Sequence, residues 1–174
     1  MSELTSEKHA PSSWARAPRI RALSSLQSHF VLSRNHVGRI AFVGDGRIEL
    51  IPVHYVYWNG VVVGRTSSGI KRALGGQGPE VVFEVDEPET LFEWRSVIVR
   101  GSIDFMAADL PSDRGAYWKA VRVFQTLLPD AFTERDPMPS RRVMFVIHPN
   151  EMTGRESSMS FLSRSSGERS PISG

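Results

Sequence analysis

Hydrophobic and polar residues follow a β-strand pattern through most of the chain. Apolar side chains alternate with polar ones or form short β-branched runs, as half-buried and buried strands require. The predicted strands cover residues 38–43, 48–58, 61–65, 79–86, 93–106 and 141–149. Asn59-Gly60 is the strongest signal for a two-residue hairpin turn, so we expect the strands on either side to be antiparallel. Gly101 is expected to bend the long fifth strand.

Two other segments have the spacing of helices. Residues 19–34 repeat apolar side chains at three- and four-residue steps. Residues 109–128 have the same spacing, and their first four residues, 109–112, are typical of a helix start. Six strands at short spacing, with helices at the start and before the last strand, predict a mainly β (α+β) fold. A closed or partly closed antiparallel barrel is favoured over an open sheet.

The two ends of the chain differ in composition from the middle. Residues 1–15 are polar without a period, and residues 156–174 are rich in Ser, Gly, Arg and Pro. Such segments bury too little apolar surface to offset the entropy of ordering. We therefore predict a disordered N-terminal segment (1–15), one domain (16–155) and a flexible Ser-rich tail (156–174).

Composition narrows the classes of function. The 174 residues are 40% hydrophobic, contain no cysteine and carry a net charge of only +2. A small, scattered positive excess is poor support for nucleic-acid binding. There is no signal-peptide pattern and no apolar run of membrane-span length, so we expect a cytoplasmic protein that binds neither membrane nor nucleic acid.

The segment VVVGRTSSGIKRAL, residues 61–74, combines features of a phosphate site. Thr66, Ser67 and Ser68 provide hydroxyls ahead of a short helical segment, and Lys71 adds a positive charge. Arg65 could bind the same anion with its two amino groups. The pattern also fits a Ser-rich turn that caps a surface helix. Taken alone, the residues favour this second interpretation.

Other polar residues are weaker candidates. The five histidines have no metal-ligand spacing, so no metal site is expected. His54 could point into a pocket or simply lie on the wetter face of its strand. Glu84 and Asp86 share a strand face, as do Trp94 and Ser96. No nucleophile-elbow, P-loop or dinucleotide-binding motif is present.

The order of the segments is more specific than any one of them. HVGRIAF, IPVHYVYWNGVVVGRTSSGIKRAL, VVFEVD, EWRSVIVRG and IHPNEMTGR follow one another between residues 26 and 155. In this order they resemble the pyridoxamine 5′-phosphate oxidase-like family of FMN-binding split barrels. The resemblance implies a six-stranded antiparallel split β-barrel with peripheral helices, which forms a homodimer with the cofactor in clefts at the subunit interface.

The resemblance also implies a set of cofactor-binding residues. The turn residues Arg65, Thr66, Ser67, Ser68 and Lys71 would hold the FMN phosphate. The preceding strand would offer Pro52, Val53, His54 and Tyr55 to the flavin ring, with backbone and side chains. Trp94 and Ser96 would lie near the same cleft, contributed by the partner subunit. Catalytic residues are not implied, because the cofactor itself carries the redox chemistry.

The family resemblance favours an FMN-dependent oxidoreductase that passes a hydride or electrons between a reduced nicotinamide and an unidentified small molecule. The Ser-rich end lacks the substrate-binding C-terminal segment of true pyridoxamine 5′-phosphate oxidases, so we do not expect that substrate. Two alternatives remain open. One is a deazaflavin-dependent reductase of the same fold, and the other is a non-catalytic flavin- or haem-binding protein in which His54 or His148 reaches an iron.

Overall fold

The computed structural model describes residues 16–44, 46–74, 79–106 and 114–161. These residues form seven strands and three helices. In chain order they are β1 (Arg16–Ala22), α1 (Ser25–Arg34), β2 (Val37–Gly44), β3 (Arg47–Trp58), β4 (Val61–Thr66), α2 (Ser68–Ala73), β5 (Glu80–Pro88), β6 (Trp94–Met106), α3 (Arg114–Gln125) and β7 (Val143–Phe161). The predicted disordered segment and the helix-start residues 109–112 lie outside the described residues.

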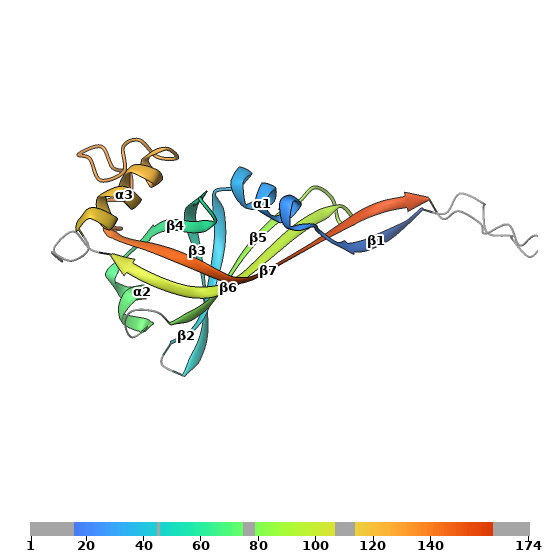
Figure 1. Cartoon of the computed structure of the whole chain (residues 1–174), viewed down its shortest axis with the longest axis horizontal. Helices are drawn as coiled ribbons and strands as arrows, with labels where there is room; N and C mark the ends of the chain where they lie inside the picture. Colours follow the sequence, from blue (N-terminus) through green and yellow to red (C-terminus); the bar gives the residue numbers. More distant parts are fainter. Residues whose placement is uncertain (1–15, 45, 75–78, 107–113, 162–174) are drawn as a thin grey trace, which may run out of the picture.

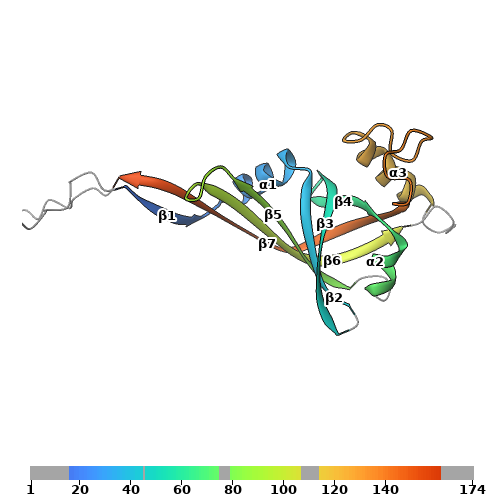
Figure 2. The ribbon, with the colours of Figure 1, turned by 180° about the vertical axis from the view of Figure 1, so that it is seen from behind.

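Six of the strands close into an antiparallel ring (Figure 1). The sheet runs in the order β1-β7-β4-β3-β2-β5-β6, and β6 then pairs with β7 along most of its length. This closure confirms the predicted mainly β, split-barrel-like class, in a sheet of seven strands where six were predicted. β1 is a seventh strand outside the ring, paired only with the far part of β7, and together they reach out from the barrel (Figure 2).

The meander β2-β3-β4 was predictable from its turn. Asn59 and Gly60 have φ angles of 48° and 83°, the left-handed pair that a tight two-residue hairpin needs. Trp58 consequently pairs with Val61, and Tyr55 with Gly64. The expected bend in β6 is also present, since its register against β7 shifts between Arg100 and Gly101.

The start of the first helix was predicted too early. The residues from Arg19 to Ala22 belong to β1, and α1 begins at Ser25. The boundary is a capping box, in which Ser24 Oγ accepts from Gln27 N–H and the Gln27 side chain accepts from Ser24 N–H. The helical spacing of apolar residues therefore includes residues of β1 and of the cap, and it did not mark the start of the helix. Leu26, which the period placed in the core, is 79% exposed.

The last strand is longer than predicted. β7 begins at Val143 and continues to Phe161, beyond the expected start of the tail at residue 156. Pairing with β1 from Ala22↔Arg155 to Arg16↔Phe161 supplies the hydrogen bonds for this extension. Glu156 and Ser157 are buried there, so the first residues of the Ser-rich segment are structural. Residues 162–174 lie outside the described part of the chain.

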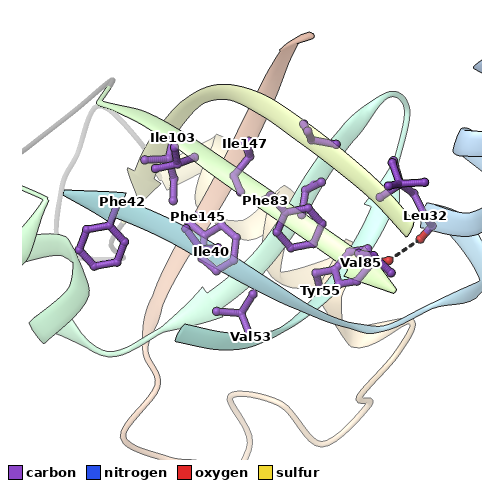
Figure 3. Close-up of a cluster of buried hydrophobic side chains, with 14 of the residues drawn as sticks. Leu32, Ile40, Phe42, Val53, Tyr55, Phe83, Val85, Ile103, Phe145 and Ile147 are labelled. Carbon is purple, nitrogen blue, oxygen red and sulfur yellow. Dashed lines mark hydrogen bonds between the residues drawn. The ribbon is translucent and has the colours of Figure 1, made fainter. Parts of the chain in front are cut away.

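The barrel interior is filled by apolar side chains from nearly every strand (Figure 3). Tyr55 packs edge-to-face on Phe83 with 4.9 Å between ring centroids, and its hydroxyl donates to the Leu32 carbonyl of α1 at 2.8 Å. Helix α1 is thereby tied to the barrel. α3 covers the outside of β4 and β7, where a second apolar cluster includes Tyr117, Val121, Phe124 and Met144. No helix within the described ranges is long and apolar enough to cross a membrane.

Gly64 leaves the space that the buried ring of Phe145 occupies in the core. A Cβ at Gly64 would lie 2.3 Å from Phe145 Cζ and 2.8 Å from the His54 carbonyl oxygen. We expect Gly64→Ala to lower the free energy of unfolding by about 2 kcal/mol, because the methyl group overpacks the core. Urea unfolding measures the change.

Gly115→Ala is the matched control for this substitution. Gly115 lies on α3 with no atom within 4 Å of its would-be Cβ. Alanine is the better helix former, so this variant should be more stable by about 0.5–1 kcal/mol. Equal effects of the two variants would contradict the packing assigned to Gly64.

Candidate functional site

The turn between β4 and α2 exposes polar side chains that the rest of the fold does not use. Ser67 caps α2 by position, yet its side chain makes no capping hydrogen bond. Ser68 is exposed and Lys71 is half-buried. Within the described residues, no hydrogen bond or ion pair engages Ser67, Ser68 or Lys71. These three groups are therefore available to an external anion, whereas Thr66 is only 3% exposed and offers it little.

Strand β3 runs beside this turn and presents two of its predicted residues outward. The β3–β4 pairing ends at Tyr55↔Gly64, so His54 and Pro52 lie on β3 just beyond the last paired residues, on the side of the turn. Pro52 and His54 are exposed. Because strand side chains alternate, Val53 and Tyr55 point into the barrel and are 3% and 0% exposed. The side chains of Val53 and Tyr55 therefore line the barrel interior and not the outward face of β3, and contact of their backbone with a flavin stays a prediction.

The surroundings of His54 favour its neutral form. Its partial burial, together with the positive charges of Arg141 and Arg65, lowers the pKa of the imidazole below its ordinary value. A neutral imidazole has one donor nitrogen and one acceptor nitrogen. It can therefore exchange hydrogen bonds with a polar ring edge without adding charge.

Arg65 does not face the turn. Its side chain is fully buried, and its two amino groups donate to the two carboxylate oxygens of Asp136 at 2.6 and 2.8 Å. The guanidinium carbon lies 5.4 Å from the ring centroid of Phe124 and 5.3 Å from that of Phe132. Within this single chain Arg65 is therefore engaged by Asp136 and does not face the turn where it was expected to bind a phosphate. Alternation puts this residue on the face that α3 and the following loop cover.

Asp136 is the partner that the sequence did not reveal. It also accepts from the backbone N–H of Phe132 and of Met138, at 2.8 and 2.9 Å. Phe132 has a φ of 66°, an unusual conformation for an aromatic residue, and Asp136 holds it there. The available signal was an Asp before Pro137, which indicates a turn but names no distant partner.

Trp94 and Ser96 lie elsewhere on the surface of the chain. They border a pocket at the β5–β6 hairpin that includes Asp86 and none of the residues of β3 or of the turn. Ser96 Oγ donates to Glu84 at 3.3 Å, and Glu84 pairs with Arg39 at 3.1 Å. Glu84 and Asp86 thus share Arg39 across two strands. One copy of the chain does not bring Trp94 and Ser96 to the turn.

The histidines form no metal site in the described part of the chain. No group of three His, Asp or Glu side chains there could hold an ion. His148 instead has a single acidic neighbour, with its Nε2 3.3 Å from Asp104 Oδ2.

Comparison with known proteins identifies a family whose model matches most of this sequence. The family model described as pyridoxamine 5′-phosphate oxidase matches residues 24–156. No match is found among curated proteins. Among solved structures, a FAD-binding protein from Mesorhizobium loti is similar at 29% identity and a TM-score of 0.60, over 80% of this chain and 99% of that one.

Two further structures share the fold at lower identity. A FAD-binding protein from Mycobacterium smegmatis has 23% identity and a TM-score of 0.57, over 78% of this chain and 98% of its own. A flavocytochrome from Azotobacter vinelandii has 14% identity and a TM-score of 0.62, over 84% of this chain and 72% of its own.

The Arg65–Asp136 pair should govern the acid stability of the α3 region. Hydrogen bonds from Arg65, and to a lesser extent from the Phe132 and Met138 backbone, hold the pKa of Asp136 well below its ordinary value. Stability from this pair is complete above the unfolded carboxyl pKa of about 4 and is lost as the pH falls below it. Asp136→Asn should cost roughly 3 kcal/mol at neutral pH, because Arg65 stays buried without a counter-charge.

Urea unfolding at neutral pH and at about pH 3 tests both parts. The variant should lose less stability than the wild type between the two conditions. Glu151→Gln is the control, since Glu151 pairs with Arg100 at the exposed surface, 3.5 Å apart. It should change stability by less than about 1 kcal/mol. An equally small effect of Asp136→Asn would show that the buried pair is not needed.

Proposed function

The chain belongs to the pyridoxamine 5′-phosphate oxidase family, and from this premise we propose that it is a flavin-dependent oxidoreductase acting on a small molecule. The flavin would accept a hydride or electrons from a reduced nicotinamide and pass them on. The protein's own share is to bind, orient and surround the cofactor. The polar turn at the end of β4 is the observation that carries the proposal.

The side chains at the turn fit a phosphate monoester. A phosphate carries between one and two negative charges at neutral pH and has several strong acceptor oxygens. Ser67 and Ser68 offer hydroxyl donors, and Lys71 offers a cation that forms no ion pair with any described carboxylate. An unused cation beside unused hydroxyls is the donor set that a phosphate requires. Arg65, held by Asp136, instead fixes β4 against α3 and so supports the turn from behind.

The ring of the flavin would lie on the outward face of β3. Pro52 gives this face a flat apolar patch, and neutral His54 gives it a hydrogen-bonding group that can meet a polar ring edge. Both residues follow the last β3–β4 pair, Tyr55↔Gly64, on the side of the turn, so one ligand could reach the phosphate donors and this face together.

FMN is the cofactor that this set supports most directly, because only one phosphate site is accounted for. Two of the similar structures are FAD-binding proteins, and a FAD would need contacts for a second phosphate and an adenosine. A deazaflavin cofactor also brings a phosphate and remains the alternative. Release of the cofactor from purified protein, followed by mass spectrometry, distinguishes the three. Protein without any flavin or deazaflavin, or with haem absorbance only, would overturn the proposal.

A second copy of the chain would complete the cleft. The outer face of the β2–β3 hairpin carries three well-exposed apolar residues, namely Val43, Ile48 and Leu50, with 68%, 83% and 62% exposure. Val43 and Ile48 are cross-strand partners, so they form one patch next to the Pro52 face. Contiguous apolar surface of this kind is typical of interfaces. In a homodimer through this face, Trp94 and Ser96 would come from the partner subunit.

Lys71→Met tests the phosphate site. The substitution keeps the length of the side chain and removes its charge, so flavin binding should weaken by about 1.5–3 kcal/mol, roughly ten- to a hundredfold. Fluorescence titration of the apoprotein with FMN gives the dissociation constant. Arg72→Met is the control, because Arg72 is the neighbouring, exposed cation. Equal loss in both variants would mean that general charge, and not Lys71, attracts the flavin.

Leu50→Glu tests the interface. A charge in the centre of the apolar patch should convert a dimer to a monomer, as light scattering after size exclusion would detect. Leu91→Glu is the control, since Leu91 is 82% exposed on the β5–β6 hairpin and not on this face. A dimer that persists in Leu50→Glu would place the interface elsewhere.

A further inference from the structure

A second pocket lies on the α3 side of the barrel, apart from the turn. It has a volume of about 490 Å³ and opens between α3, the β3–β4 hairpin and the ends of β6 and β7. At about 3.3 Å per residue, Trp58 in this pocket lies roughly 13 Å along β3 from His54. The two sites share no residue, and along β4 the buried Arg65 comes after the pocket residues Val61 and Val63 and before the turn.

Short side chains on both walls keep the pocket open. Ala116, Ala120 and Val123 face it from successive turns of α3. Val61, Val63 and Val146 face it from β4 and β7. On the neighbouring face of the same helix, the larger Tyr117 and Phe124 are buried and pack against the sheet. The pocket is therefore specified by the choice of small residues at these positions.

The pocket has a lysine, Lys119, in its lining. The Lys119 ammonium lies 5.0 Å from the centroid of the Trp58 ring, within cation–π range. None of the described carboxylates forms an ion pair with Lys119. Together Trp58 and Lys119 offer a flat apolar surface beside a positive charge that pairs with no carboxylate of the described residues.

The pocket lining also has an acceptor. Asp104 and His148 both border the pocket and pair with each other at 3.3 Å, and both are about half exposed. A carboxylate has capacity for several hydrogen bonds, so Asp104 can accept from a ligand hydroxyl while His148 remains beside it. The pocket is thus apolar in the middle, cationic at Lys119 and accepting at Asp104.

We propose that this pocket binds a small, flat aromatic acid that carries a hydroxyl or amino group at its far end. The carboxylate pairs with Lys119, the ring lies between Trp58 and the small residues of α3, and the distal donor bonds Asp104. Binding at this site does not depend on the flavin assignment.

Isothermal titration of the full chain with p-coumarate tests the site. We expect saturable binding, tighter than that of cinnamate, which lacks the distal hydroxyl. Lys119→Met should weaken p-coumarate binding about tenfold and leave methyl p-coumarate unchanged, because the ester has no charge to lose. Asp104→Asn should reduce the preference for p-coumarate over cinnamate.

Two further variants separate the pocket from general effects. Ala116→Leu projects into the pocket from an exposed helix position and should abolish binding of all three compounds without changing the thermal unfolding temperature. Arg122→Met removes an exposed cation of α3 that does not border the pocket, and should change nothing. The proposal is overturned by absence of saturable binding, by equal effects of Lys119→Met and Arg122→Met, or by full binding in Ala116→Leu.

Discussion

Closure of the barrel depends on one strand. β7 pairs with β4 along one edge and with β6 along the other, so the backbone groups of all three strands are satisfied only when it is in place. It is also the last strand in the chain, and its partners are separated from it by many residues. The ring can therefore form only after nearly all of the described sequence is available, and the positions of the turn, of β3 and of α3 all follow from that ring.

Local sequence patterns predicted most of the strands and turns of the fold. Alternation, the Asn59-Gly60 turn and the flexible point at Gly101 each state a backbone preference within a few residues, and the structure has the strands and turns that they predict. The errors came where local preference was ambiguous. Apolar residues from 20 to 31 keep a helical period, but pairing of β1 with β7, more than 130 residues away in the chain, makes the first of them a strand. The Ser-rich start of the tail becomes a strand for the same reason.

The candidate site was predictable only in part. The sequence gives the type of each residue, but it does not show in which direction the side chain points. Ser67, Ser68 and Lys71 lie where the spacing suggested. Val53, Tyr55 and Arg65 are in the expected segments, yet the alternation of side chains turns them inward or under α3. Parity along β3 could have identified Val53 and Tyr55 as interior residues. No local pattern could have paired Arg65 with Asp136. The two residues are 71 positions apart in the sequence and meet only in the folded chain.

The pairing of β1 with β7 leaves β1 as an outer strand of the sheet. An outer strand offers unpaired backbone groups that can recruit strands from other molecules and start aggregation. β1 reads RAPRIRA, so it combines a proline, which has no N–H to donate, with the charged and exposed side chain of Arg19. Arg21 pairs with Glu156 of β7, so the residues that tie β1 to the sheet lie beside residues that make its free edge a poor template for a further strand.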